Sequence, residues 1–343
     1  MTKPIIHNLE ERKNDHLRLT EAAQLALYQR DERFNYEPLF SPLELPNLKT
    51  KTFLKKQLRA PLWISSMTGG AESGKKINYN LAKACQEFGL GMGLGSCRPL
   101  LEDKKYLADF DLRPILGSDR PFYANLGIAQ VEELLKKKQA EKINELINTL
   151  EADGLIIHIN PLQEYLQSEG DRYLRPPMET IEEAISKIKF PLIVKEVGQG
   201  MGPKSLRALL KLPLAAIELA ALGGTNFSKL ELQRSMDAGK KEVYQPMSRI
   251  GHSAEEMIYL INQIEAEEPH QVLCRDIIIS GGIKTFLDGH YLMQKCHLSS
   301  VYGQASSLLK YAKHSYESLR QYIEYQIEAL KLAQALLNLR ERG

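Results

Sequence analysis

Four polar side chains crowd into the seven residues 158–164 (HINPLQE), namely His158, Asn160, Gln163 and Glu164. His158 lies in the last part of the apolar run 155–159 and the other three follow it, so all four lie where a short strand would end. A single histidine in such a place is usually a hydrogen-bonded structural residue, whereas four polar groups together favour a functional site. Their spacing matches no zinc motif. One carboxylate, Glu164, suits a Mg²⁺ ion that is shared with substrate phosphates and water.

Lys195 stands inside the apolar run 192–197 (LIVKEV). An unpaired ammonium is costly to bury, so we expect Lys195 to face a polar cavity or to pair with a carboxylate. A salt bridge to Glu218 or Glu164 would be a structural role. Stabilisation of an anionic ring or intermediate would be a functional role, and the two can coexist.

Glycines follow the last two apolar runs of the chain, at Gly281, Gly282 and Gly303. The same place in parallel barrels often binds a phosphate, because backbone N–H groups at a helix start attract anions. The plainer interpretation is that these glycines only make tight turns.

Basic residues occur in small local groups. Arg12, Lys13 and His16 cluster near the N-terminus, and Arg98 follows the second apolar run. They could be solvated helix starts, or they could clamp a diphosphate, for which Arg98 offers a bidentate fork. The lysines at 136–138 are expected on a solvated helix face, and residues 50–56 (TKTFLKK) are expected to form an edge hairpin without chemistry.

Eight short apolar runs, most of them followed by helical periodicity, must position these residues. The runs are 62–66, 91–94, 122–126, 155–159, 192–197, 216–220, 276–280 and 300–302. Helical period is clearest over 131–150, where apolar residues recur every three or four positions. This alternation predicts an α/β fold with a parallel sheet, and eight units favour a closed (β/α)₈ TIM barrel over an open doubly wound sheet. The polar residues would then meet at the carboxyl ends of the strands.

The rest of the chain extends this barrel. Residues 1–60 form an N-terminal extension, with a helix expected at about 18–30, and residues 61–343 form the barrel. Residues 226–270 are an insertion between strands six and seven, and its polar part, 227–249, has the composition of an active-site excursion or lid. Residues 305–340 are expected to form one long helix or two.

Composition excludes several classes of protein. The 343 residues carry a formal net charge of +2, which gives no overall attraction to nucleic acid or to an anionic membrane. No apolar run is long enough to span a bilayer, and the N-terminus is too polar for a secretory signal. The four cysteines suggest no disulfide framework. We therefore expect a soluble cytoplasmic protein.

Taken in order, several motifs resemble the type 2 isopentenyl-diphosphate isomerases, a family of FMN-dependent (β/α)₈ enzymes. The motifs are RKNDH (12–16), MTGG (67–70), GSCR (95–98), HINPLQE (158–164), KEVGQG (195–200), GGTNF (223–227) and SGGIK (280–284). The combination of HINPLQE with an upstream RKxxH is specific, whereas MTGG and SGGI would suit other FMN barrels as well.

The resemblance implies a role for each matching residue. The residues expected to contact the flavin are Ser66, Met67, Thr68, Gly69, Ser96, Asn125, Lys195 and Thr225. The residues expected to bind the flavin phosphate are Gly281, Gly282, Gly303 and Gln304, with Lys284 in the place of the family's usual arginine. The residues expected to bind the substrate diphosphate are Arg12, Lys13, His16, Ser96, Cys97 and Arg98. Gln163 would stand beside the reacting carbons, Glu164 would hold Mg²⁺, and His158, Asn160 and Lys195 would complete the catalytic group.

The activity implied is the interconversion of isopentenyl and dimethylallyl diphosphate, a 1,3-allylic proton shift in isoprenoid biosynthesis that uses reduced FMN, Mg²⁺ and NADPH as reductant. A homo-oligomer, a tetramer or larger, is also implied. The sequence shows no pair of carboxylates obviously placed as acid and base, and a glutamine is a poor acid alone. This points to the cofactor as the proton carrier.

Besides Lys284, two further departures from the family pattern concern the cofactor end. Residues 218–222 (ELAAL) stand where the family has small residues, and the last loop, 302–307 (YGQASS), lacks an arginine. One alternative is an FMN-dependent 2-hydroxy-acid oxidoreductase, for which His252 and Arg249 are the available base and carboxylate ligand. It leaves RKxxH and HINPLQE unexplained. Another alternative is a barrel without catalytic activity that binds flavin or partners.

Overall fold

The structure, a computed structural model, describes residues 9–42, 44, 45, 47–66 and 72–340. They divide into two compact units. The larger unit runs from residue 42 to residue 335. The smaller unit joins the described residues up to Ser41 to those from Leu336 onward.

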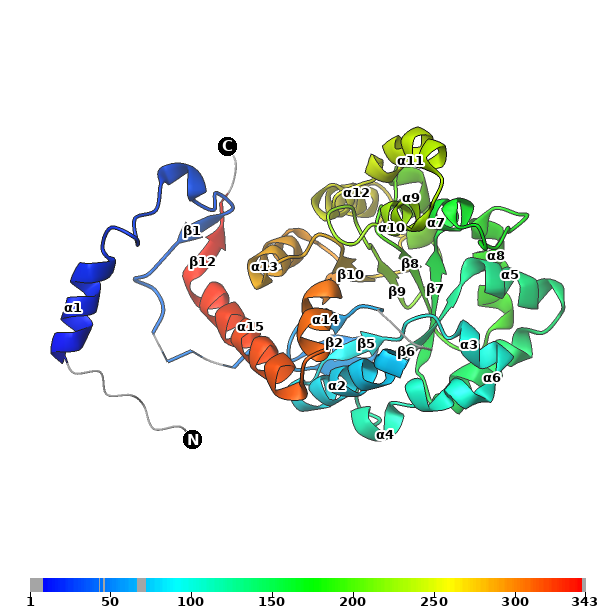
Figure 1. The fold of residues 1–343 in the computed structure, drawn as a ribbon, viewed down its shortest axis with the longest axis horizontal. Helices are drawn as coiled ribbons and strands as arrows, with labels where there is room; N and C mark the ends of the chain where they lie inside the picture. The colour runs from blue at the N-terminus through cyan, green and yellow to red at the C-terminus, as the bar shows by residue number, and fades with distance from the viewer. Residues whose placement is uncertain (1–8, 43, 46, 67–71, 341–343) are drawn as a thin grey trace. The chain divides into compact units, whose positions relative to one another are not determined.

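The larger unit is built on a closed barrel of eight parallel strands (Figure 1). The strands are β4 (Leu62–Ile64), β5 (Gly91–Gly93), β6 (Phe122–Gly127), β7 (Gly154–Ile159), β8 (Leu192–Glu196), β9 (Ala216–Glu218), β10 (Asp276–Ser280) and β11 (Ser299–Gln304). β11 pairs with β4 and thereby closes the ring. The predicted (β/α)₈ barrel and its eight strands are confirmed.

Helices connect consecutive strands and cover the barrel. They are α2 (Glu72–Phe88), α3 (Arg98–Glu102), η2 (Lys104–Asp109), α4 (Arg113–Leu116), α5 (Ile128–Lys136), α6 (Ala140–Thr149), α7 (Pro161–Leu166), α8 (Pro177–Lys187), α9 (Pro203–Leu210) and α13 (Phe286–Lys295). The segment 131–150, where helical period is clearest, is helical but is divided between α5 and α6. The chain breaks between α5 and α6, where Lys138 takes a left-handed φ of 55°. Of the three lysines there, Lys136 pairs with the buried Glu132.

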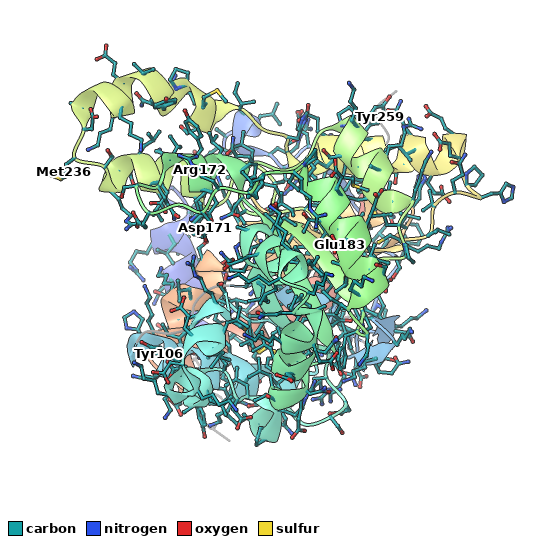
Figure 2. All side chains as sticks on the ribbon, turned by 90° about the vertical axis from the view of Figure 1, so that its right-hand side faces the viewer. Tyr106, Asp171, Arg172, Glu183, Met236 and Tyr259 are labelled. Carbon is teal, nitrogen blue, oxygen red and sulfur yellow. The ribbon has the colours of Figure 1, made fainter. Side chains whose placement is uncertain are left out.

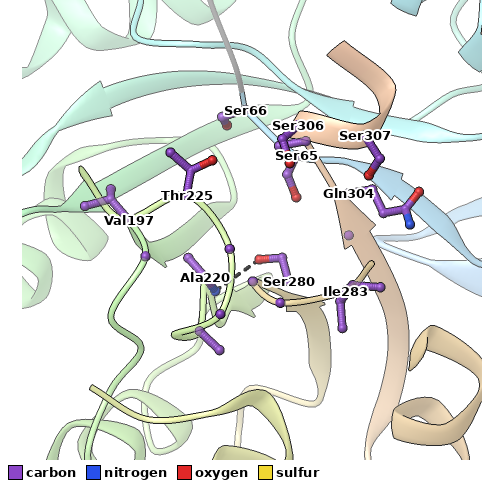
Figure 3. Close-up of a pocket in the computed structure, with 18 of the residues that line it drawn as sticks. Ser65, Ser66, Val197, Ala220, Thr225, Ser280, Ile283, Gln304, Ser306 and Ser307 are labelled. Carbon is purple, nitrogen blue, oxygen red and sulfur yellow. Dashed lines mark hydrogen bonds between the residues drawn. The ribbon is translucent and has the colours of Figure 1, made fainter. Parts of the chain in front are cut away.

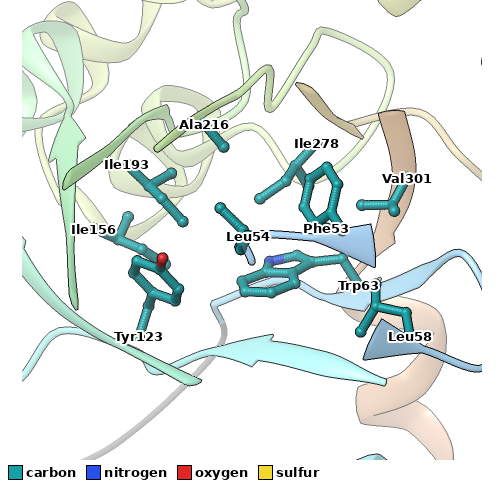
Figure 4. Close-up of a cluster of buried hydrophobic side chains, with 10 residues drawn as sticks. All are labelled: Phe53, Leu54, Leu58, Trp63, Tyr123, Ile156, Ile193, Ala216, Ile278 and Val301. Atoms are coloured by element: carbon teal, nitrogen blue, oxygen red, sulfur yellow. The ribbon is translucent and has the colours of Figure 1, made fainter. Parts of the chain in front are cut away.

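A hairpin closes the amino-terminal end of the barrel. Its strands are β2 (Lys51–Phe53) and β3 (Lys56–Leu58), which pair only with each other. The backbone N–H of Leu54 donates to Asp276, the first residue of β10. Phe53, Leu54 and Leu58 belong to the buried cluster inside the barrel, beside Trp63 (Figure 4). The predicted hairpin is therefore present, but it plugs the barrel, because its apolar residues need burial.

The insertion between β9 and β10 is helical. It contains α10 (Phe227–Arg234), α11 (Ala238–Tyr244), η3 (Gln245–Arg249) and α12 (Ala254–Glu267). Asn226 caps α10 by accepting from the Lys229 N–H, and its amide donates to the Ser248 carbonyl, 2.8 Å away. The polar composition of this segment thus reflects capped surface helices.

The C-terminal segment is two helices, α14 (Ser306–Ala312) and α15 (Tyr316–Leu336), as one of the two expectations had it. In the smaller unit, β12 (Leu337–Leu339) pairs antiparallel with β1 (Phe34–Tyr36), which follows η1 (Leu27–Gln29). The helix predicted at 18–30 is wrong.

The N-terminal helix, α1, is Leu9–Leu19, with Glu10 and Glu11 in its first turn and His16 and Arg18 in its last. This charge order suits the helix dipole and explains the earlier start. In the described part of the chain, no helix has both the length and the apolar character to cross a bilayer.

Candidate active site

Inward-facing residues form two layers inside the barrel. The lower layer is apolar and includes Trp63, Tyr123, Ile156, Ile193, Ala216, Ile278 and Val301 (Figure 4). Side chains alternate along a strand, so residues two positions later face the same way. These are Ser65, Asn125, His158, Lys195, Glu218, Ser280 and Gly303. The period-two alternation therefore places a ring of polar residues and glycine at the carboxyl ends of the strands, above an apolar core.

A cavity of about 500 Å³ opens at this end of the barrel (Figure 3). It is lined by the ends of β4, β8, β9, β10 and β11 and by the loops that follow them. Among its lining residues are these predicted cofactor contacts: Ser66, Lys195, Thr225, Gly281, Gly282, Lys284, Gly303 and Gln304. Ser96 and Asn125 do not line it. Met67, Thr68 and Gly69 lie outside the described residues.

Gly281 and Gly282 shape one wall of the cavity. Both have left-handed backbones, with φ of +88° and +74°. A Cβ atom on Gly281 would lie 2.1 Å from the backbone nitrogen of Ala221. That nitrogen donates to the Ser280 carbonyl at 2.8 Å. The loops after β9 and β10 therefore approach as closely as two backbones can, which requires glycine at position 281.

Polar atoms without protein partners face this region. Gln304 is 2% exposed, and neither its amide nitrogen nor its amide oxygen has a hydrogen-bond partner among the described residues. The buried hydroxyl of Ser65 likewise has none among them. Buried polar groups are almost always satisfied. These atoms therefore fit a polar ligand in the cavity.

Lys195 enters the cavity from β8 and has a carboxylate beside it. Its Nζ lies 3.5 Å from Oε1 of Glu218 on the neighbouring strand, and it donates to the Glu196 carbonyl at 3.0 Å. The Ser280 hydroxyl donates to the same Glu218 oxygen at 3.1 Å. The expected salt bridge is present. Lys195 also lines the cavity, and its stabilisation of an anionic ring or intermediate stays a prediction.

His158 is oriented by a chain of hydrogen bonds. The Asn125 amide nitrogen donates to the Ser66 hydroxyl and the Leu94 carbonyl, so its oxygen faces Nδ1 of His158 at 2.7 Å. Nδ1 therefore carries the proton and Nε2 is left as an acceptor. Burial, helped by the charge of Lys195, lowers the pKa of His158 to about 4. The ring is neutral at ordinary pH.

The polar run after β7 begins helix α7. The Asn160 amide nitrogen donates to Oε1 of Glu164 at 3.0 Å and to Oε1 of Gln163 at 3.2 Å. The other oxygen of Glu164 accepts from the backbone N–H of Asp171 at 2.7 Å. The Asn160 side-chain oxygen is buried without a partner in the described residues. The structure thus brings three of the predicted residues into one cluster.

One member of this cluster was missed by the sequence analysis. Glu231 on α10 is 4% exposed, and its Oε1 accepts from Gln163 at 3.3 Å and from Gln167 at 2.9 Å. Arg234 balances its charge at 2.7 Å. Glu231 stands in a segment of mixed charged, polar and apolar residues, 227–234 (FSKLELQR), and no local pattern marks it as buried.

Arg98 is tied to the same cluster through Asp171. Its Nη1 lies 2.6 Å from Oδ2 of Asp171, which also accepts from Gln130 at 2.6 Å. Asp171 lies in the segment between α7 and α8 (Figure 2). Ser96 accepts from the Arg98 N–H, and Cys97 is fully buried. A diphosphate bound by Arg98 would therefore compete with Asp171.

The basic cluster of the N-terminus lies on α1 in the smaller unit. Arg12 and His16 are four residues apart and share a helix face, with Lys13 beside them, and all three are exposed. Their role in binding substrate stays a prediction.

A metal site made by the protein alone is absent from the described part of the chain, where no three His, Cys, Asp or Glu residues could hold an ion. Glu164 and the unpartnered oxygen of Asn160 are hard oxygen ligands. This set suits an ion whose remaining ligands are phosphate oxygens and water.

The architecture and the cavity define a class: a (β/α)₈ barrel with a cavity at the carboxyl ends of its last strands, where such barrels often bind phosphate. Comparison with models of known families finds no match. An isopentenyl-diphosphate delta-isomerase of Rickettsia felis is 33% identical over 283 residues, covering 82% of this chain and 78% of the relative. That of Rickettsia africae is 32% identical over 330 residues, covering 94% and 92%. The chain belongs to the isopentenyl-diphosphate delta-isomerase family.

Solved structures agree on the fold. A mandelate oxidase variant with a monooxide FMN adduct superposes with a TM-score of 0.56 at 11% identity, covering 90% of this chain and 88% of that one. Another mandelate oxidase gives 0.55 at 11% identity, covering 90% and 86%.

Proposed function

We propose that this chain is a type 2, FMN-dependent isomerase that interconverts isopentenyl and dimethylallyl diphosphate. The observation that carries the proposal is the junction of two half-sites at one end of the barrel. One is a cavity with a glycine wall and unsatisfied polar groups, and the other is the cluster on α7. The chain of hydrogen bonds from Ser66 through Asn125 to His158 runs from the cavity to β7, the strand that leads into α7.

The cavity fits FMN. Its volume of about 500 Å³ is in the range of cofactor sites. Gly281 and Gly282 permit a phosphate to approach backbone N–H groups, and Lys284 and Gln304 line the same region. One of the mandelate oxidase structures that share the fold is named with an FMN adduct, which supports this assignment. Reduced FMN, when bound, would supply the acid–base chemistry that moves protons on the substrate.

The reaction adds a proton at one end of an allylic unit and removes one from the other, with no net change in oxidation state. This chain's residues would orient the substrate. Gln163 is held at both ends, by Asn160 and by Glu231, so its amide presents a fixed polar face. Glu164 would bind the Mg²⁺ ion of the diphosphate together with Asn160. NADPH is proposed as the source of the reduced flavin.

The lining of the cavity argues against the oxidoreductase alternative. Arg249 and His252, which would have to act as carboxylate ligand and base, do not line the cavity. Arg249 is exposed on the insertion, and Nδ1 of His252 lies 3.8 Å from Glu256 on α12.

The test is an anaerobic assay of isopentenyl diphosphate with FMN, NADPH and Mg²⁺. Gln163→Ala should lose at least about tenfold in kcat, which corresponds to about 1.4 kcal/mol. The matched control is Gln167→Ala, because Gln167 donates to the same oxygen of Glu231 one turn later. Equal losses in the two variants would contradict the role of Gln163. A folded, flavin-bound protein without isomerase activity would refute the proposed function.

A further inference from the structure

The polar ring beneath the cavity contains one acidic residue among the members named above, Glu218. It is fully buried on β9, and its side chain faces the barrel interior in register with Lys195 on β8. Its Oε1 meets Lys195 and Ser280, whereas its Oε2 has no hydrogen-bond partner among the described residues. Glu218 does not line the cavity, so any effect it has on a ligand passes through its neighbours.

Charge on this ring is balanced. Lys195 contributes one positive charge, Glu218 one negative charge, and His158 is neutral because its pKa is lowered. At an effective dielectric of about 20, unit charges about 4 Å apart interact by several kcal/mol. The charge that Lys195 can offer a ligand above it is therefore reduced by Glu218.

We propose that Glu218 is a positioning residue that holds Lys195 and attenuates its charge, and thereby weakens the preference of the cavity for the reduced, more anionic flavin. This inference rests on the proposed use of FMN. Neutralising Glu218 would leave the floor of the cavity with a net positive charge, which favours electron-rich reduced flavin over oxidised flavin.

The first experiment measures FMN affinity and reduction potential in Glu218→Gln. This variant keeps the shape of the side chain and removes its charge. We expect the ratio of reduced to oxidised FMN affinity to rise about tenfold, which is about 30 mV for a two-electron couple. Glu132→Gln is the matched control, since Glu132 is an equally buried carboxylate on α5 whose partner, Lys136, lies outside the cavity.

If Glu218→Gln alone does not fold, a double substitution of Lys195 and Glu218 tests the same proposal. In Lys195→Gln alone, Glu218 becomes a buried charge without its cation and should repel the flavin. Adding Glu218→Gln removes that charge, so the double variant should bind FMN more tightly than Lys195→Gln does. A structural role for Glu218 gives the opposite order.

Two results would overturn the inference. One is a folded Glu218→Gln protein whose potential and FMN affinity equal those of the unmodified protein. The other is a double variant that binds FMN no better than Lys195→Gln. Failure of the unmodified protein to bind FMN at all would instead refute the proposed function, so the two failures are distinguishable.

Discussion

Replacing Gly281 by alanine tests the close approach of the loops after β9 and β10. The new Cβ would lie 2.1 Å from the Ala221 nitrogen and 2.2 Å from the Ala221 oxygen, with Ala220 carbon at 2.7 Å. Ordinary contacts are about 3.5–4.0 Å, so backbone atoms must move by more than about 1 Å. A left-handed φ adds roughly 1–2 kcal/mol and overpacking another 1–3 kcal/mol. We expect a total loss of about 2–5 kcal/mol in unfolding free energy.

Gly282 is the matched control, because it has the same backbone conformation without the clash. Its φ is +74°, and the nearest atom to an added Cβ is the Leu222 oxygen at 3.4 Å. Gly282→Ala should therefore cost only the left-handed backbone term, about 1–2 kcal/mol. The difference between the two variants isolates the loop contact.

Urea unfolding and FMN titration by flavin fluorescence measure the two effects. Gly281→Ala should unfold at a lower urea midpoint than Gly282→Ala and bind FMN at least about tenfold more weakly than the unmodified protein, because its loops separate at the cavity wall. Equal midpoints for the two variants would refute the geometric reasoning. Unchanged FMN affinity in Gly281→Ala would refute the placement of the cofactor at this wall.

Three further outcomes follow from the site. The pKa of His158 is about 4 in the folded protein against 6.5 for a free histidine, so the unfolded chain takes up the proton first as the pH falls. The stabilisation present above pH 6.5 is therefore lost toward pH 4, by up to about 3 kcal/mol. His158→Asn should lack this pH dependence of the unfolding free energy, measured by urea unfolding. Glu231→Ala should lower kcat at least about tenfold with FMN affinity within about twofold; a matching loss of affinity would contradict its role in holding Gln163. Lys284→Arg should tighten FMN binding several-fold, because a guanidinium donates two hydrogen bonds to a phosphate, and Lys284→Ala should weaken FMN binding. Equal FMN affinities of the two variants and the unmodified protein would place Lys284 away from the phosphate.

The barrel could be predicted from the sequence because its signal is local. Each strand is a short apolar run that ends in polar or glycine residues, and β10 matches its predicted bounds of Asp276–Ser280. Helix boundaries are harder to predict from the sequence. The break between α5 and α6 depends on the left-handed backbone of Lys138, a residue type that gives no sign of it. The plug formed by the hairpin at Phe53 depends on where the hairpin packs, which its sequence does not state.

The site was predictable where residues sit at strand ends and obscure where they arrive from an insertion. His158 and Lys195 lie near the carboxyl ends of β7 and β8, and Gly281 follows β10 directly, so their type and position were informative together. Glu231 reaches the cluster only because α10 packs against α7, a tertiary contact that the surrounding sequence does not indicate. The sequence offered two carboxylates as partners of Lys195, Glu218 and Glu164. The register of β8 and β9 places Glu218 beside Lys195 and so decides between them.

The most direct test of the central claim is the ratio of product formed to NADPH consumed by the purified, FMN-bound protein under anaerobic conditions. A proton shift without net redox change needs the flavin to be reduced only once. We therefore expect many molecules of dimethylallyl diphosphate per NADPH oxidised, with no product when the flavin is kept oxidised. Consumption of one NADPH per product, or isomerisation by protein free of flavin, would contradict the account.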